Sequence, residues 1–237
     1  MTADASMRDC LLECRGLDAG YGGRAVVEQL DLRVAPGEVV ALFGPNGAGK
    51  STTLLTLAGV LPRVAGEVSM FGSDRRASLT ELARRGLGVI PEGRSIFSAL
   101  TVRENLILGR GGPQRATDLF PELTEHLDRR AGLLSGGQQQ MVVLARVLAA
   151  QPKLLLADEL SLGLAPLVVQ RLLRAIRDAV DSSGLGVLLV EQRIDEALSV
   201  ADRVYVLDDG RIGLTATAAE IRRDPGKLKS LYLKSTG

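Results

Sequence analysis

The sequence predicts an α/β fold built on a parallel sheet, because short apolar runs alternate along the chain with longer amphipathic stretches. The chain has 237 residues, of which 46% are hydrophobic and 24% are charged, so one domain with a sizeable core is expected. The apolar runs are nearly uninterrupted, which is typical of strands that are buried on both faces. We expect such strands at 38–43, 86–91, 153–158 and 186–191.

The other elements are predicted in order along the chain. Short strands joined by turns are expected before residue 38 and again near 66–72, so a small antiparallel sheet should flank the parallel one. The segment from about 94 to 150 is expected to be mostly helical, and Asp209-Gly210 predicts the turn of a hairpin. Helical spacing of apolar residues predicts helices over 50–60, 136–150 and 166–182.

Composition excludes several classes of function. Lys plus Arg number 29 against 28 Asp plus Glu, and aromatic residues make up 3%, so nucleic acid is not expected to be the main partner. No window approaches the roughly 20 apolar residues that span a bilayer, and the start has no apolar secretory segment, so a cytoplasmic protein is expected. Cys10 and Cys14, with one histidine in the chain, cannot complete a usual zinc site and are expected to be reduced structural thiols.

A phosphate-binding loop directly follows the strand at 38–43. The run Gly44-Pro-Asn-Gly-Ala-Gly-Lys50-Ser51 matches GxxxxGKS and leads into a helix-forming stretch, as in P-loop NTPases. Backbone N–H groups and the positive end of the helix dipole would hold phosphate oxygens. Lys50 is expected to reach the β- and γ-phosphates, and Ser51 to bind Mg²⁺. The nucleotide-binding candidates are Gly44, Pro45, Asn46, Gly47, Ala48, Gly49, Lys50, Ser51 and Thr52.

Two carboxylates end the strand at 153–158. In open parallel sheets, ligands bind at the carboxyl ends of the strands, so Asp158 and Glu159 are expected beside the phosphate loop. Asp158 is predicted to hold the magnesium shell. Glu159 is predicted to accept a proton from the attacking water or to orient it.

The segment Leu134-Ser-Gly-Gly-Gln138 precedes the helix expected at 136–150. Together with the phosphate loop and the Asp-Glu strand, in this order, it makes the chain resemble the ATP-binding cassette (ABC) family. The resemblance implies that Ser135, Gly136, Gly137 and Gln138 meet a nucleotide held by a second subunit, so that the ATPase works as a head-to-tail dimer. It also implies that Tyr21 stacks on adenine; the alternative is a turn tyrosine that packs locally.

The chain departs from the general family pattern at several positions. Glu92 stands where the family usually has a glutamine, and it is a candidate metal ligand. Gln192 stands where the family usually has a histidine that contacts the γ-phosphate, so weaker catalytic help is expected. The only histidine, His126, is expected at a solvated helix position. Leu160 and Ala165 replace a common proline and aspartate, which makes communication between the two sites of a dimer less certain.

Taken together, these departures resemble one branch of the family, the ATP-binding subunits of branched-chain amino acid importers. The matching stretches are Pro91–Phe97, Leu100–Leu106, Asp158–Pro166 and Leu188–Gln192. The resemblance implies ATP and Mg²⁺ as cofactors, membrane permease subunits, a sister or identical ATPase subunit, and indirectly a periplasmic or lipoprotein solute-binding protein. It implies a peripheral place on the inner face of the cell membrane, with 92–105 docking a cytoplasmic helix of the permease.

Alternatives remain open at this point. The same motor could serve urea or short amides, or the chain could be a soluble non-transport ABC ATPase, or a degenerate cassette that only binds nucleotide. We expect a single ABC ATPase domain over 8–237 with no fused membrane or regulatory domain. Its core is expected at about 8–92 and 150–237, and its helical subdomain, which carries the Ser135 segment, at about 93–149.

Overall fold

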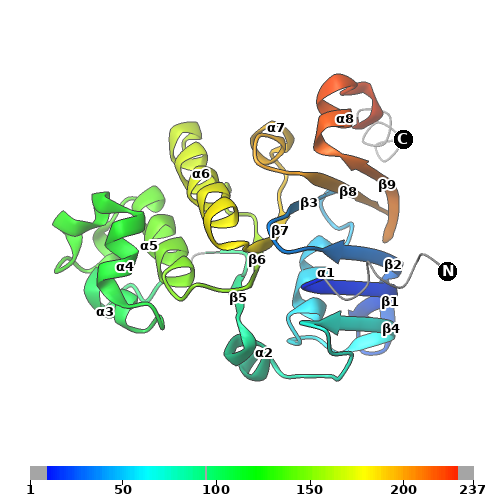
Figure 1. Ribbon diagram of the computed structural model, residues 1–237, viewed down its shortest axis with the longest axis horizontal. Helices are drawn as coiled ribbons and strands as arrows, with labels where there is room; N and C mark the ends of the chain where they lie inside the picture. Colours follow the sequence, from blue (N-terminus) through cyan, green and yellow to red (C-terminus); the bar gives the residue numbers. More distant parts are fainter. Residues whose placement is uncertain (1–9, 94, 229–237) are drawn as a thin grey trace.

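The computed structural model describes residues 10–93 and 95–228. Its elements form a six-stranded sheet, a three-stranded sheet and a group of helices at one end of the molecule (Figure 1). Two sequence predictions reach beyond the described residues: the two ends of the 8–237 domain, and Arg94 in the Pro91–Phe97 motif.

The six-stranded sheet has the order β5-β6-β7-β3-β8-β9. Its first five strands, including β3, are parallel, and β9 runs antiparallel to β8. The prediction of an α/β fold with a parallel core and of its four buried strands is confirmed. The strands are β3 (Val39–Phe43), β5 (Leu87–Ile90), β6 (Leu154–Asp158), β7 (Gly186–Val190), β8 (Arg203–Asp208) and β9 (Arg211–Thr217).

Each central strand faces two separate cores. In β3, Val39, Ala41 and Phe43 pack into one core, while Val40 and Leu42 pack into the other. Every residue of β3, β6 and β7 is buried. Because successive side chains of a strand point to opposite faces, a strand covered on both sides must be apolar throughout, which explains the uninterrupted runs.

The smaller sheet is antiparallel, with the order β2-β1-β4, as predicted; its strands are β1 (Leu12–Tyr21), β2 (Arg24–Val34) and β4 (Arg63–Met70). It packs through α1 (Lys50–Leu57) against the larger sheet, and Leu54 and Leu57 of this helix lie in the core that the two sheets share. Cys10 and Cys14 are both free cysteines in the described structure, and Cys14 is buried. Burial raises the pKa of the Cys14 thiol to about 12.

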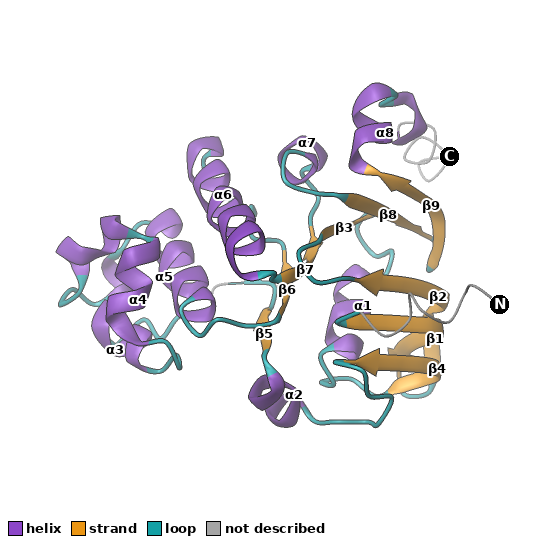
Figure 2. Ribbon diagram, in the orientation of Figure 1, coloured by secondary structure: helices purple, strands orange, loops and turns teal. Residues whose placement is uncertain are grey.

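Helices α3, α4 and α5 gather at the end of the molecule away from the small sheet (Figure 2). The predicted helices are present with small shifts: the first ends at Leu57, shortly before Gly59 with φ +72°, and the third ends at Ser183, where Gly184 has φ +71°. Across residues 10–93 and 95–228, no helix is both long enough and apolar enough to cross a membrane. The bounds are α2 (Leu79–Arg85), α3 (Val102–Ile107), α4 (Gly112–Leu119), α5 (Gly136–Leu148), α6 (Pro166–Ser183), α7 (Ile194–Leu198) and α8 (Ala218–Arg223), with 3₁₀ turns η1 (Pro121–His126) and η2 (Ala131–Leu133).

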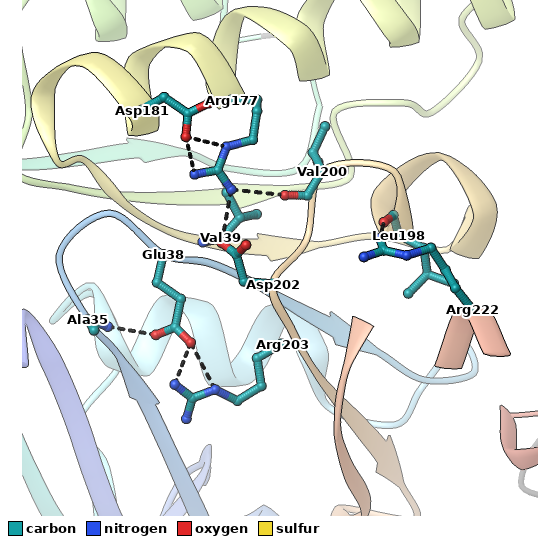
Figure 3. Close-up of polar contacts among 10 residues, drawn as sticks. All are labelled: Ala35, Glu38, Val39, Arg177, Asp181, Leu198, Val200, Asp202, Arg203 and Arg222. Atoms are coloured by element: carbon teal, nitrogen blue, oxygen red, sulfur yellow. Dashed lines mark hydrogen bonds and ion pairs between the residues drawn. The ribbon is translucent and has the colours of Figure 1, made fainter. Parts of the chain in front are cut away.

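The predicted hairpin at Asp209-Gly210 is confirmed, since both residues have positive φ (+45° and +73°), as a type I′ turn requires. At the opposite end of the sheet, polar contacts tie β3, β8 and α6 together (Figure 3). Glu38 accepts hydrogen bonds from the Ala35 amide and the Arg203 guanidinium, each at 2.9 Å. The Glu38 carboxylate therefore joins the segment before β3 to β8, at the end of the sheet remote from the phosphate loop.

Candidate active site

The phosphate loop lies between β3 and α1 and depends on glycine at Gly49. This residue is the N-cap of α1 with φ +101°, and a Cβ built on it would lie 2.3 Å from Val27 Cγ2 of β2. A side chain would therefore be strained by the backbone conformation and would clash with the small sheet. The loop can pass this close to β2 only because the residue has no side chain.

Lys50 is the first residue of α1, and it is almost completely buried. Its ammonium donates hydrogen bonds to the carbonyl oxygens of Gly44 at 2.9 Å and Pro45 at 3.0 Å. Burial lowers the pKa of Lys50, while the nearby carboxylates, first Glu159 and then Asp158, favour its charged form. The carbonyl groups of the phosphate loop therefore hold the Lys50 ammonium at the site where it is expected to bind phosphate.

The loop and four other chain segments line one cavity of about 300 Å³. Asn46, Gly47, Gly49, Lys50, Ser51 and Thr52 come from the loop and the start of α1. They meet Glu92, Glu159 and Gln192, which follow β5, β6 and β7 respectively. The structure therefore brings the loop together with three of the four polar residues that were predicted to act with it, whereas Asp158 is not among the described residues that line the cavity. It also adds Val26 of β2, which the sequence analysis missed.

Asp158 ends β6 beside Ser51. Its carboxyl is buried, and this burial raises its pKa to about 6, while a hydrogen bond with Ser51 opposes the rise. Among the described residues, its Oδ1 atom has no hydrogen-bond partner. An orphaned buried carboxylate oxygen beside a hydroxyl fits Mg²⁺, which prefers oxygen ligands. The described chain has no group of three His, Cys, Asp or Glu side chains that could hold a metal, so phosphate and water oxygens would have to complete such a site.

Glu159 has an unusual backbone conformation, with φ +49° in a residue that is not glycine. This left-handed conformation costs roughly 1–2 kcal/mol, so the surrounding contacts must hold it. The Glu159 amide donates to the Val190 carbonyl at 2.9 Å, and the Gln192 amide nitrogen lies 2.5 Å from Glu159 Oε1. The end of β7 therefore fixes both the backbone and the carboxylate of Glu159 at the cavity.

Glu191 is a buried acid that the sequence analysis did not single out. It is 2% exposed, and its two oxygens accept hydrogen bonds from the Ser161 amide (3.1 Å) and the Ser161 hydroxyl (2.5 Å). Burial raises its pKa to about 7; the negative charge of Glu159 acts in the same direction, and the Ser161 hydrogen bonds oppose the rise. A charged residue directly after the wholly apolar run 186–190 was the only sequence signal.

The raised pKa of Glu191 predicts that Glu191→Gln stabilises the protein at alkaline pH. The folded-state pKa of about 7 lies above the ordinary value of 4.5, so the stability linked to the neutral acid is present below pH 4.5 and is lost as the pH rises through 7. Glutamine does not titrate. We expect equal stability near pH 5 and a gain of roughly 1–3 kcal/mol for the variant at pH 8. Urea unfolding at both pH values measures this, and a gain of the same size at pH 5 would contradict it.

The Ser135 segment begins α5 and lies away from the cavity. Ser135 and Gln138 form a reciprocal cap: the Gln138 amide donates to Ser135 Oγ at 3.3 Å, and Gln138 Oε1 accepts from the Ser135 amide at 3.0 Å. Neither these two residues nor Gly136 and Gly137 are among the described residues that line the cavity. The Ser135 segment therefore does not share this cavity with the phosphate loop of its own chain.

The prediction of a solvated His126 was wrong. Its side chain is only 16% exposed, and its Nε2 atom lies 2.9 Å from the Gln138 side-chain nitrogen. The reason is that the 3₁₀ turn Pro121–His126 folds back onto the start of α5, which no local pattern reveals. His126 therefore supports the Ser135 segment through its contact with Gln138.

Tyr21 ends β1 at the edge of the small sheet. Its side chain is exposed, and its hydroxyl accepts a hydrogen bond from Thr52 Oγ1 at 3.4 Å. The structure therefore places the ring next to the first turn of α1. Its predicted stacking on adenine stays a prediction.

The segment 92–105 presents an aromatic side chain. Asn105 is fully buried and bonds both to the Phe97 amide and to the Phe97 carbonyl, each at 3.0 Å. Phe97 itself is 53% exposed and lies against the Arg146 guanidinium, 5.6 Å from ring centre to Cζ. A fixed backbone that displays an exposed phenyl ring agrees with the predicted docking role of this segment, which stays a prediction.

Comparison with known proteins gives concordant matches. A family model described as "ABC transporter" matches residues 27–161. The chain is 40% identical over 223 residues to the high-affinity branched-chain amino acid transport ATP-binding protein BraG of Pseudomonas aeruginosa, covering 90% of this chain and 95% of that protein. It is 39% identical over 236 residues to the lipopolysaccharide export system ATP-binding protein LptB of Escherichia coli, covering 94% and 96%. A solved ATP-binding subunit of an ABC transporter superposes with a TM-score of 0.82 at 32% identity, covering 96% and 100%.

Proposed function

The chain belongs to the ABC transporter family of ATP-hydrolysing domains, and from this premise we propose that it powers a bacterial importer of branched-chain amino acids. ATPase subunits of this family bind and hydrolyse ATP, dimerise and work with membrane permease subunits. The observation that carries the ATPase part of the proposal is the cavity in which the phosphate loop, Glu92, Glu159 and Gln192 meet. No other arrangement in the described chain combines a phosphate cradle with a carboxylate positioned to activate water.

Binding begins at the loop. The triphosphate lies against the N–H groups at the start of α1, where the helix dipole favours negative charge. The Lys50 ammonium exchanges its bonds to the Gly44 and Pro45 carbonyls for phosphate oxygens. Asp158, Ser51 and Glu92 would hold Mg²⁺, which supplies neutralisation of phosphate charge.

Hydrolysis then depends on Glu159. Its carboxylate accepts a proton from the water that attacks the γ-phosphate, because it is the acid that faces the cavity from the end of β6. Gln192 donates a hydrogen bond to Glu159 Oε1 and so holds that carboxylate toward the water. The neutral amide contributes orientation rather than charge, in contrast to the histidine usual at this position.

A second cassette completes the site. The Ser135 segment does not reach the cavity of its own chain, so a head-to-tail dimer would bring the Ser135 segment of one subunit onto the nucleotide of the other. Leu162 and Leu167 follow β6 along the chain and are 58% and 79% exposed, which favours burial against another protein surface. The second subunit is either a sister ATPase or an identical copy.

The permease and the solute-binding protein complete the proposed complex. The subunit lies on the inner face of the cell membrane, and Phe97 in the segment 92–105 meets a cytoplasmic helix of the permease. The solute-binding protein, periplasmic or lipid-anchored, acts through the permease. The branched-chain cargo is supported by the similarity to BraG and by the Pro91–Phe97 and Leu188–Gln192 motifs. The comparable similarity to LptB makes lipopolysaccharide export the competing assignment.

An uptake experiment tests the cargo. Cells lacking this chain should lose high-affinity uptake of labelled leucine about tenfold or more, because import against a gradient requires ATP hydrolysis, and they should keep normal urea uptake. Complementation with the intact chain should restore uptake, while complementation with Lys50→Ala should not.

Three results would contradict the cargo assignment. Selective loss of urea uptake would assign the motor to amides. Accumulation of lipopolysaccharide at the inner membrane with normal leucine uptake would assign it to export. Normal uptake of both solutes and normal lipopolysaccharide would favour a non-transport ABC ATPase.

A further inference from the structure

Two chain segments meet beside the cavity and are joined by four hydrogen bonds. One segment runs from Asp158 to Ser161 after β6, and the other from Val190 to Gln192 after β7. The Glu159 amide bonds to the Val190 carbonyl, Gln192 bonds to the Glu159 carboxylate, and Glu191 receives two bonds from Ser161. Glu159, the acid that faces the cavity, is therefore held by its own hydrogen bonds. The hydrogen bonds of Ser161, two positions further along the chain, also hold it.

Glu191 does not face the nucleotide cavity, so it requires another explanation. It is absent from the described residues that line the cavity, and both of its oxygens point to Ser161, which is itself 3% exposed. A buried carboxylate is costly unless its oxygens accept good hydrogen bonds. A hydrophobic residue could fill this space at a lower cost in desolvation free energy. The presence of an acid is therefore explained by its hydrogen bonds to Ser161.

The contact acts on the backbone of Glu159. That residue has φ +49°, a conformation that persists only where the neighbours on both sides are fixed. On the amino-terminal side, Asp158 is fixed by pairing in the sheet. On the carboxyl-terminal side, the Ser161 amide and hydroxyl are fixed by Glu191.

We propose that Glu191 is a positioning residue: through Ser161 it fixes the turn after β6 and so aims the Glu159 carboxylate at the attacking water. The proposal rests on the role of Glu159 in the proposed function. Displacement of a catalytic group by about 1 Å can reduce a rate by about 100-fold, so loss of the contact should lower kcat. It should leave ATP binding nearly unchanged, because, among the described residues, neither Glu191 nor Ser161 lines the cavity, and their side-chain hydrogen bonds are to each other rather than to the phosphate loop.

Three variants of the purified full chain test this, with kcat and KM for ATP measured per folded molecule. Glu191→Ala leaves the Ser161 amide without its acceptor, so kcat should fall about 10- to 100-fold while KM changes less than about threefold. Glu191→Gln can keep both contacts, by accepting from the amide and donating to the hydroxyl, so kcat should stay within about threefold of the original. Ser161→Ala removes the hydroxyl contact alone and should lower kcat about 3- to 10-fold.

Glu38→Gln is the matched control. It removes another carboxylate that accepts a backbone amide, at the remote end of the sheet, and it should lower the melting temperature without changing kcat. If Glu191→Ala fails to fold, Ser161→Ala and Glu191→Gln carry the test.

The outcomes separate the possible roles. An unchanged kcat in Glu191→Ala or, where that variant does not fold, in Ser161→Ala would overturn the proposal. An equal loss in Glu191→Gln and Glu191→Ala would overturn it too, since charge rather than hydrogen bonding would then matter. A rise in KM at constant kcat would overturn it in favour of a binding role. Glu159→Gln is measured in parallel: normal turnover there would defeat the role that the proposed function gives to Glu159, whereas loss of turnover there with normal Glu191 variants would defeat only this inference.

Discussion

Glu159→Gln should bind ATP and fail to hydrolyse it. The substitution keeps the size of the side chain and removes its capacity to accept a proton, so turnover should fall about 100- to 10,000-fold while ATP affinity stays within a few-fold. A dimer that closes on ATP and reopens after hydrolysis would then persist in the closed state. Phosphate release and gel filtration with and without ATP measure the two effects on the same sample.

The control for this prediction is Glu67→Gln, which neutralises an exposed carboxylate on β4 that does not line the cavity. It should leave both turnover and oligomeric state unchanged. Normal phosphate release by Glu159→Gln would reject Glu159 as the general base and would direct attention to Glu92, the other acid that lines the cavity.

Lys50→Ala should lose nucleotide binding rather than chemistry alone. The ammonium is expected to make charge-assisted bonds to the β- and γ-phosphates, each worth about 1.5–3 kcal/mol, so ATP affinity should weaken about 100-fold or more. The substitution also removes the two bonds that hold the Gly44 and Pro45 carbonyls. Equilibrium titration with a fluorescent ATP analogue measures the change.

Lys153→Ala serves as the matched control, because this lysine is exposed and precedes β6 at the opposite end of the strand from Asp158. Its ATP affinity should equal that of the unmodified chain. If Lys50→Ala bound ATP with unchanged affinity but hydrolysed it slowly, the lysine would act on the transition state alone.

The fold could be predicted well from the sequence because its main determinants are local. Strands β3, β6 and β7 are buried on both faces, so each is an apolar run that stands out from its neighbours. The phosphate loop could be located for the same reason, since its glycines and Lys50 are consecutive. The parallel sheet then brings the residues after β5, β6 and β7 to one edge, which makes the meeting of Glu92, Glu159 and Gln192 a consequence of topology.

The contacts that were missed or wrongly predicted all join distant segments. Glu191 and Ser161 are 30 positions apart, and only the packing of two strand ends makes them partners. His126 and Gln138 meet because a 3₁₀ turn reverses the chain, and a short polar segment such as Pro121–His126 has no apolar periodicity to indicate which side is covered. Local sequence patterns predict helices and strands. Contacts such as Glu191–Ser161 and His126–Gln138 depend instead on how these helices, strands and turns pack against one another.

The bonds between Lys50 and the loop carbonyls have a consequence for the speed of the cycle. Because the Gly44 and Pro45 carbonyls accept hydrogen bonds from the ammonium, folding itself meets the cost of drawing this charge out of water and holds it in the loop where phosphate is expected to bind. Once the γ-phosphate has left, the same carbonyls can again accept hydrogen bonds from the Lys50 ammonium. We therefore expect these carbonyls to compete with the phosphates for the ammonium, which weakens the hold of the site on the product nucleotide and favours its release.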